Sequence, residues 1–490
     1  MSLLGVDIGT SAIKVVAYEA ETGAELSSAR SEYASDYPGP GLMELDPELV
    51  WTGFVDAVRF VNAAEAVQRD PVTAFALSVS CDEVIPVDDT TRPLGPCIMA
   101  PDARGADVVP QINDRISAAE LYGRTGLGSL PIYPLARILW YRKHQPDVAR
   151  AASRYLGWGE FFLTRLGLPA VTDETTAGRW LAYDVVAHDW MYDLADALRL
   201  PPAILPDVAS PGDVIGKLST DVSSRLGFRA PPLAVAGAFD QICAAVGAGL
   251  DATGDAVVGS GTWENTTIVA DRPLGPIGLE IGATWGPYAS PGRYAVLLMN
   301  PGGGSVLRWF RDQISGASGS EADTSEPPSQ LLYLPQLRGS RTGGGGFNSA
   351  GALVGLTVAT SRDDVVRALR EGITFELSLN LEGIAPEVTI HPPLRNTGGG
   401  ARSTSWVQLK ADVLGMAVST VEASEPGCLG AAILAGVGAG VFSEVTAAQA
   451  QVCRIATQVD PDPERHRSYS DRLALYRDLC PALRNVLTSN

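Results

Sequence analysis

Residues 3–18 of the chain read LLGVDIGTSAIKVVAY. Two short runs rich in apolar and β-branched residues, 3–6 and 13–18, are typical of strands, and the intervening DIGTS at 7–11 has the residues of a tight turn. A second turn signal at 21–23, Glu-Thr-Gly, leads into another extended segment. The pattern predicts a β-meander at the start of the chain.

A similar pattern begins again near the middle of the chain. Residues 256–259 and 266–270 read as short strands around the Gly-Thr pair at 261–262, which echoes the pair at 9–10. Glycine is common between strands, so the echo alone is compatible with an unrelated hairpin. Its place near the midpoint favours a second unit of the same kind.

Helices and loops are expected elsewhere. Residues 46–47, Asp-Pro, supply an N-cap and a first-turn proline before apolar residues at helical spacing. Residues 134–200 read as a mainly helical insertion in the first unit, and 428–442 as a buried helix too short to cross a bilayer. The polar stretch 316–330 is expected to be a mobile surface loop, and the glycine run 343–346 a flexible connection.

Composition restricts the possible partners and setting. A length of 490 residues predicts roughly two to four domains, and 46% hydrophobic with 19% charged residues is typical of globular proteins. The formal charge of -19 disfavours nucleic acid and anionic membranes as partners. The six cysteines are scattered and far from the four histidines, so no zinc pattern is present. With no signal-peptide pattern at the start, the chain is expected in the reducing cytoplasm.

The first turn has the chemistry of a phosphate site. Asp7 leaves a strand end beside Gly9, whose lack of a side chain lets backbone N–H groups face a ligand, and Lys14 adds positive charge. A carboxylate in that place suits phosphate held with Mg²⁺. A plain hairpin turn explains the same residues equally well. The spacing matches neither a P-loop nor a dinucleotide-binding fingerprint.

Asp240 is the candidate general base. It ends the apolar strand 234–239 and precedes the apolar, helix-like segment 242–250. A carboxylate is costly to bury without a role, and phosphoryl transfer to an alcohol needs an acceptor for the hydroxyl proton. An N-cap role at the start of the following helix is the equally weighted alternative.

Two other carboxylates and a glycine run also follow apolar strands. Asp82 and Asp102, with Asp240, offer oxygen atoms that accept hydrogen bonds from hydroxyl groups. A solvated turn is the slightly favoured account of Asp82 and of Asp102 taken singly. Residues 398–401, Gly-Gly-Gly-Ala, lie where a nucleotide could approach the backbone, although a flexible connection is the commoner meaning of such a run.

Taken in order, these segments resemble the FGGY carbohydrate kinase family over nearly the whole chain, and the xylulose kinases within it most of all. The segments that carry the resemblance are 7–11 (DIGTS), 40–47 (PGLMELDP), 134–140 (PLARILW), 237–240 (GAFD), 261–262 (GT), 351–356 (GALVGL) and 398–403 (GGGARS). Arg137 stands where the family usually has lysine, so the positive charge is kept.

The resemblance implies an α/β fold of two actin-like, ribonuclease H-like domains of the sugar kinase, Hsp70 and actin superfamily, with an interdomain cleft. The expected domains are 1–248, which binds the sugar and carries the base, and 249–490, which binds the nucleotide. The implied activity is transfer of the γ-phosphate of ATP, with Mg²⁺, to a hydroxyl of a small sugar or polyol. A homodimer is one assembly that the resemblance allows.

The resemblance also implies roles for individual residues. Asp240 is the expected catalytic base and, with Cys81, Asp82 and Asp102, a sugar ligand. Asp7 is the expected metal ligand. The expected ATP ligands are Thr10, Ser11, Lys14, Gly261, Thr262, Gly399, Gly400 and Ala401.

One departure concerns the sugar. Xylulose kinases usually carry Gln-Met-His-Gly where this chain has SCDE at 80–83, and glycerol kinases carry a carboxylate at the place of Asp82. D-xylulose is the expected acceptor, and ribulose, fuculose, erythritol and glycerol are the alternatives. A non-catalytic actin-like sensor and an actin-like phosphohydrolase are compatible with the same fold. The presence of Asp240 disfavours the sensor.

Overall fold

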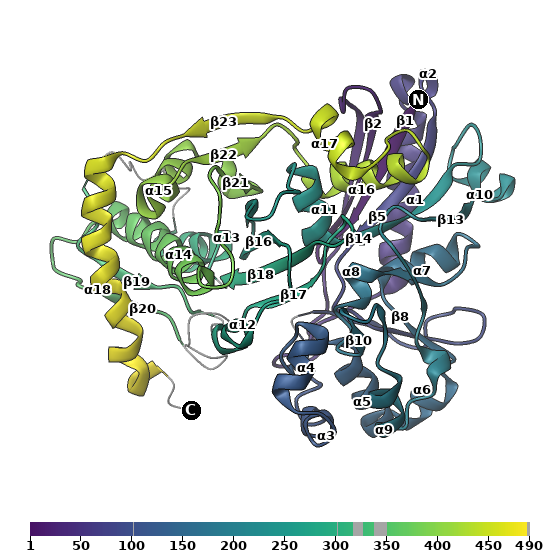
Figure 1. Ribbon diagram of the computed structural model, residues 1–490, viewed down its shortest axis with the longest axis horizontal. Coiled ribbons are helices and arrows are strands. Elements are labelled where there is room, and N and C mark those ends of the chain that lie inside the picture. The colour runs from purple at the N-terminus through teal and green to yellow at the C-terminus, as the bar shows by residue number, and fades with distance from the viewer. Residues whose placement is uncertain (101, 301, 317–326, 338–349, 488–490) are drawn as a thin grey trace.

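The computed structural model describes residues 1–490 apart from 101, 301, 317–326, 338–349 and 488–490. It has two lobes, each built on one large mixed β-sheet with helices packed around it (Figure 1). Most of the expected loop at 316–330 and the whole glycine run at 343–346 lie outside the described residues.

The first sheet confirms the expected meander. Its strands, in spatial order, are β13 (Val214–Lys217), β14 (Leu233–Phe239), β5 (Val72–Val79), β1 (Ser2–Ile8), β2 (Ala12–Glu19) and β3 (Glu25–Glu32). β1, β2 and β3 are antiparallel neighbours, whereas β1, β5 and β14 run parallel. The central strand β1 is almost wholly buried, which explains its nearly continuous apolar sequence.

The second sheet repeats this arrangement and confirms the second unit. Its strands, in spatial order, are β17 (Thr284–Pro287), β18 (Tyr294–Asn300), β16 (Glu264–Ala270), β15 (Ala256–Ser260), β21 (Leu394–Thr397), β22 (Val418–Val421) and β23 (Ile455–Val459). β15, β16 and β18 form an antiparallel meander, and β15, β21 and β22 run parallel. Each sheet also has an antiparallel strand beyond its last parallel strand, β13 in the first and β23 in the second.

Helices surround both sheets. Those of the first half are α1 (Pro47–Ala63), α2 (Glu65–Arg69), α3 (Val109–Asn113), α4 (Ala118–Thr125), α5 (Pro134–His144), α6 (Pro146–Ala151), α7 (Trp158–Arg165), α8 (Glu174–Ala177), α9 (Tyr192–Ala197), α10 (Thr220–Arg225) and α11 (Asp240–Gly247). Those of the second half are α12 (Pro276–Ile281), α13 (Gly304–Trp309), α14 (Arg362–Ile384), α15 (Thr404–Leu414), α16 (Pro426–Gly438), α17 (Val445–Val452) and α18 (Pro463–Leu487). Within the described residues, no helix combines the length and apolar character that a bilayer crossing requires.

The start of α1 and the insertion at 134–200 agree with the sequence expectations only in part. Asp46 caps α1 as predicted, with its carboxylate accepting a hydrogen bond from the Glu48 amide, although Leu49 and Phe60 of the apolar pattern are exposed. The insertion at 134–200 contains α5 to α9, but also the short strands β8 (Arg154–Leu156), β9 (Val171–Asp173), β10 (Tyr183–Asp184) and β11 (Asp189–Trp190). Strands of two or three residues are too short to show a two-residue periodicity in the sequence.

Helices α11 and α16 pack against each other and join the two lobes. A Cβ atom on Gly430 of α16 would lie 1.9 Å from the Cys243 carbonyl oxygen of α11, and one on Gly247 would lie 2.0 Å from the Pro426 carbonyl oxygen. α16 also touches β1, where a Cβ on Gly5 would lie 1.8 Å from the Cys428 carbonyl oxygen. The predicted buried helix is thus confirmed, and it covers the first sheet although it comes late in the chain.

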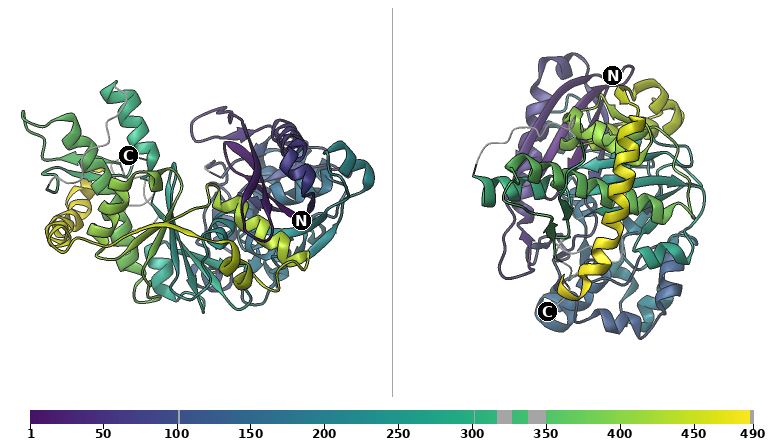
Figure 2. Two further views of the ribbon diagram at one scale, coloured as in Figure 1. Left: turned by 90° about the horizontal axis from the view of Figure 1, so that it is seen from above. Right: turned by 90° about the vertical axis from the view of Figure 1, so that its left-hand side faces the viewer.

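α18 runs along the outer side of the second lobe, away from the first (Figure 1 and Figure 2). One apolar cluster contains Val235 of β14, Val257 of β15 and Ala432 of α16, so the two sheets share a core around α11 and α16. This shared core fixes the edges of the two sheets relative to each other.

Candidate active site

The carboxyl ends of three neighbouring parallel strands meet at one edge of the first sheet. Asp7 lies near the end of β1, Asp82 lies shortly after β5, and Asp240 directly follows β14. Parallel strands bring their carboxyl ends to the same edge of a sheet. The charges of Asp7 and Asp82 both act on the Asp240 carboxyl, which reflects their closeness. The fold thus brings together three residues that the sequence singled out.

Asp240 is the first residue of α11 and does not cap it. The N-cap position belongs to Phe239, and the helix has no side-chain cap. Oδ1 of Asp240 is buried and has no hydrogen-bond partner among the described residues, although the residue as a whole is only half-buried. Burial, and then the charges of Asp7 and Glu83, raise the pKa of Asp240 well above its ordinary value. The N-cap alternative is therefore wrong, and the role of Asp240 as a base stays a prediction with which the raised pKa is compatible.

A β-bulge in β14 directs the chain toward this position. The register of β14 against β5 shifts between Val235 and Ala238. A Cβ on Gly237 would lie 1.7 Å from the Leu77 carbonyl oxygen, so only glycine fits between the strands there. The glycine of the GAFD segment is therefore needed for the close approach that sets the start of α11.

Asp82 forms a two-pronged ion pair with Arg179, which the sequence analysis did not single out. Nε and Nη2 of Arg179 each lie 3.2 Å from a carboxylate oxygen of Asp82. The guanidinium lies over the rings of Tyr133 and Phe239, with centroids at 5.1 and 5.5 Å. Nη1 of Arg179 donates to Oγ1 of Thr284 in β17, at 3.3 Å. Arg179 therefore links the carboxylate edge of the first sheet to the second lobe.

Cys81 lies beside this pair. Its side chain is buried, and its Sγ lies 3.8 Å from Oδ1 of Asp82. Burial, and then the charge of Asp82, raise the pKa of the Cys81 thiol well above its ordinary value. The thiol is therefore neutral and adds an apolar wall rather than a nucleophile.

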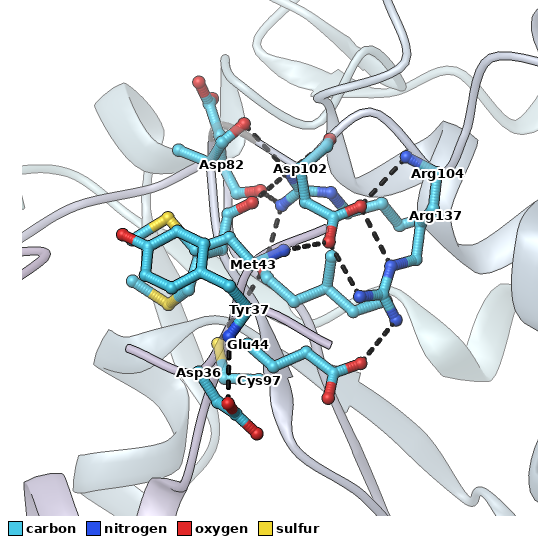
Figure 3. Close-up of polar contacts among 12 residues, drawn as sticks. Asp36, Tyr37, Met43, Glu44, Asp82, Cys97, Asp102, Arg104 and Arg137 are labelled. Carbon is cyan, nitrogen blue, oxygen red and sulfur yellow. Dashed lines mark hydrogen bonds and ion pairs between the residues drawn. The ribbon is translucent and has the colours of Figure 1, made fainter. Parts of the chain in front are cut away.

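Asp102 is placed differently from Asp82 and Asp240. Its carboxylate is fully buried and accepts bonds from the Met43 amide at 2.7 Å and from Arg104, whose Nη2 lies at 2.7 Å and Nε at 2.9 Å (Figure 3). Arg104 in turn pairs with Glu44 at 2.8 Å and lies over the Trp140 ring. Protein donors thus engage both oxygens of Asp102. Its role as a sugar ligand stays a prediction, and the geometry favours a role in positioning the neighbouring loops.

Arg137, from the 134–140 segment, holds the backbone around Asp82. It is fully buried and donates to the carbonyl oxygens of Asp82, of Ile98 at 3.0 Å and of Met99 at 2.6 Å (Figure 3). Among the carboxylates that act on Arg137, the fully buried Glu83 has the largest effect. Burial, with the charge of Asp82 adding to it, raises the pKa of Glu83 to about 7. A fixed positive charge here holds the loop that presents Asp82.

The first turn carries the predicted phosphate residues. Thr10 and Ser11 are exposed at its tip. Oδ1 of Asp7 accepts from Ser78 Oγ at 2.7 Å, and Oδ2 lies 3.5 Å from Lys14 Nζ. Lys14 also pairs with Glu425 at 2.6 Å, just before α16. Burial alone would lower the pKa of Lys14, but these carboxylates outweigh it and raise the pKa, so the lysine stays charged.

Two glycine turns meet at the corresponding edge of the second sheet. Gly261-Thr262 is exposed between β15 and β16, and 398–401 follows β21. Gly398 has a φ of 78°, and a Cβ on it would lie 3.0 Å from the Ser260 carbonyl oxygen. A Cβ on Gly400 would lie 2.6 Å from the Ser260 Cβ. The backbones of the two turns therefore approach each other in a way that side chains would prevent.

A buried ion pair between Lys410 and Glu264, which the sequence did not predict, holds the strand ends that carry these turns. Nζ of Lys410 in α15 lies 2.5 Å from Oε1 of Glu264, and both side chains are almost fully buried. Lys410 also donates to Oγ of Ser260 and to Oδ1 of Asn396, the latter at 3.3 Å. The cluster joins the ends of β15, β16 and β21, which carry the glycine turns.

The residues present fit a nucleotide with a divalent cation. Within the described part of the chain, no group of three or more His, Cys, Asp or Glu residues could hold a metal by itself. Mg²⁺ usually needs only one or two carboxylates because phosphate oxygens and waters complete its shell. Asp7 supplies such a carboxylate, with partial exposure, beside an open turn.

Comparisons with known proteins agree with this geometry. Residues 2–247 match the N-terminal domain, and 256–439 the C-terminal domain, of the FGGY family of carbohydrate kinases. An L-xylulose/3-keto-L-gulonate kinase of Escherichia coli K12 is 26% identical, over 98% of this chain and 97% of that protein.

Solved structures share the fold. The ligand-bound xylulose kinase of Lactobacillus acidophilus has a TM-score of 0.87 at 23% identity and covers 98% of each chain. The glycerol kinase of Plasmodium falciparum with ADP has a TM-score of 0.84 at 19% identity and also covers 98% of each chain. The two family models together span most of the described lobes, so the chain belongs to the FGGY family of carbohydrate kinases.

Proposed function

We propose that the chain transfers the γ-phosphate of ATP to a hydroxyl of a small open-chain sugar, with D-xylulose as the first candidate. The observation that carries the proposal is the buried Oδ1 of Asp240, which has no partner among the described residues and sits at the sheet edge with Asp7 and Asp82. The names of two relatives, an L-xylulose/3-keto-L-gulonate kinase and a xylulose kinase of Staphylococcus xylosus, support a pentulose acceptor.

In this proposal the first lobe, within 1–248, binds the acceptor. Asp240 accepts the hydroxyl proton as the oxygen attacks phosphorus, because phosphoryl transfer asks for little more than alignment and charge stabilisation. Asp82, held by Arg179, accepts bonds from other hydroxyl groups on the lone pairs that the guanidinium leaves open. Cys81 lines the same place and limits its width.

The nucleotide binds between the first turn and the second lobe, within 249–490. Thr10, Ser11 and Lys14 contact the transferring phosphate from the first turn, and the backbone amides of Gly261 and Thr262 contact it from the second. The close-packed turn containing Gly399, Gly400 and Ala401 receives the adenosine. Asp7 would hold Mg²⁺, which when bound neutralises charge on the phosphate oxygens.

A polyol such as erythritol or glycerol is the second candidate acceptor. The observation that favours it is the carboxylate of Asp82 at the end of β5, which accepts hydrogen bonds only. A polyol has a hydroxyl donor at every carbon. A ketose has a carbonyl group at one carbon, and the Asp82 carboxylate has no proton to donate to it.

The test is ADP release from ATP and Mg²⁺ with a panel of pentuloses, tetritols and glycerol. We compare the unmodified chain with Asp240→Asn, which keeps the shape of the side chain, and with Asp56→Asn on the exposed face of α1 as the matched control. We expect one compound to stimulate release, and Asp240→Asn to lower kcat by about 10²- to 10⁴-fold, the usual contribution of a general base. ADP binding should be the same in all three proteins.

Two results would argue against the proposal. ADP release that no acceptor stimulates and that Asp240→Asn does not change would indicate hydrolysis by another route. Binding of ATP with no turnover on any compound would indicate a sensor protein.

A further inference from the structure

A cavity in the first lobe, separate from the candidate active site, concentrates positive charge. It has a volume of about 530 Å³ and is lined by Gln111, Asp114, Arg115, Leu139, Arg142, Lys143, Ala197, Leu198 and Arg199. The lining contains four cations and one carboxylate, in a chain of net charge -19. All four cationic residues are exposed. The lining residues come from in or just after α3, α5 and α9, whose ribbons lie at the bottom of Figure 1.

Two of the four cations have no role in the fold. Among the described residues, the side chains of Arg115 and Arg199 make no hydrogen bond or ion pair. Arg142 donates to the Leu198 carbonyl oxygen at 2.9 Å, and Lys143 pairs with Asp107 at 2.7 Å. Cations near helix ends are partly explained by the helix dipole, and this applies to Arg142 and Lys143 in the last turn of α5. Arg115 and Arg199 also lie just beyond the C-terminal ends of α3 and α9, so the dipole favours them too, but no side-chain contact within the described residues holds either of them.

The backbone at Arg199 gives an independent indication. Arg199 has a φ of 57°, just after α9, in the left-handed region where glycine or asparagine is the usual residue. An arginine there costs conformational energy that glycine would not. Strained backbone of this kind concentrates at functional positions. The lining of the cavity thus includes an arginine at a position where the backbone favours glycine.

We propose that this cavity binds a small molecule that carries two or more phosphate groups. Guanidinium groups match the planar, two-oxygen edge of a phosphate, and several of them around one cavity favour a multivalent anion over a single one. The volume suits a ligand of metabolite size rather than an inorganic ion alone. The overall charge of -19 disfavours an extended polyanion, whereas a small anion feels mainly the cations within about 8 Å at physiological salt.

The cavity is distinct from the nucleotide site. None of its lining residues belongs to the strand ends or glycine turns described above. α5 has Tyr133, which lies under Arg179, at its start, and Arg142 and Lys143 near its end. The 11 residues of α5 span about 16 Å at the rise of an α-helix, so the length of this helix separates the cations of the cavity from the residues around Arg179.

The test uses inorganic pyrophosphate as the probe and isothermal titration calorimetry as the readout. The full chain is first saturated with ADP so that its nucleotide site is filled. The variants are Arg115→Gln combined with Arg199→Gly, and Arg225→Gln on the exposed α10 as the matched control. Arg199→Gly also relieves the backbone strain, so the double variant should melt no lower than the unmodified chain.

We expect one pyrophosphate to bind to the ADP-saturated chain, with an affinity that falls as salt rises. The double variant should bind it more than tenfold more weakly, and Arg225→Gln should bind it as the unmodified chain does. The proposal is overturned if ADP abolishes pyrophosphate binding, because the probe then occupies the nucleotide site. It is also overturned if the double variant, folded by its melting curve, binds pyrophosphate with unchanged affinity.

Discussion

At the scale of single residues, the raised pKa of Asp240 has a consequence for the pH dependence of turnover. A general base acts only when deprotonated, and burial with the charges of Asp7 and Glu83 raises the pKa of this carboxyl. Turnover should therefore fall on acidification at a pH clearly above about 3.9, the ordinary value for aspartate. The measurement is kcat against pH at saturating ATP and acceptor, with ADP affinity measured at each pH as the control. A kcat that stays flat down to about pH 4 would contradict the assignment.

Single residues also show what the sequence could and could not predict. Asp7, Asp82 and Asp240 could be predicted because each lies at or shortly after the end of its own apolar strand, a pattern visible within a few residues. Arg179 was missed because its partner, Asp82, is 97 residues away. The pair of Lys410 with Glu264 spans 146 residues, and an isolated lysine in a helix carries no local sign of burial. Local patterns locate strand ends, but only the fold shows which charges meet.

At the scale of elements, α15 holds the glycine turns through Lys410. Lys410→Met leaves Glu264 buried without its partner, and the loss of one member of a buried pair typically costs about 3–5 kcal/mol. We expect the free energy of unfolding to fall by about that amount, and the KM for ATP to rise because the turns loosen. Denaturant unfolding and steady-state kinetics measure the two effects.

The matched control for this element is the double variant Lys410→Met with Glu264→Gln. It removes both charges, so it should recover most of the stability that Lys410→Met loses. If the single and double variants are equally unstable, the ion pair does not hold the turns, and the packing of Lys410 against Trp406, whose ring lies 5.1 Å from Nζ, is what matters.

At the scale of the whole molecule, the contact of α11 with α16 should make the lobes unfold together. Gly430→Ala places a Cβ only 1.9 Å from the Cys243 carbonyl oxygen, so the two helices must separate. Such overpacking typically costs about 1–3 kcal/mol. Thermal unfolding should shift to lower temperature in one transition that includes both lobes. Gly123→Ala, in α4 with no atom within 4 Å of the added Cβ, is the control and should not destabilise the protein.

A variant that melts in two separate steps would contradict the prediction that α11 and α16 make the lobes unfold together.

The contact between α11 and α16 also shows what the sequence could not predict at this scale. The repeat of the meander predicted two units, and the two sheets confirm it. The pattern of 428–442 predicted a buried helix but not which sheet it covers, because Gly5 and Gly430 show their role only when the chain is folded.

The late position of α16 in the chain means that it is synthesised long after the sheet that it covers. The first lobe is complete in sequence at Gly247, yet the helix that covers its sheet begins only at Pro426. At ~5–20 residues per second, a ribosome needs roughly 10–35 s to make the stretch between them. During that interval the part of the apolar face of β1, β5 and β14 that α16 later covers has only the neighbouring α11 beside it. We therefore expect chaperones to bind the nascent chain during this interval and not the finished protein.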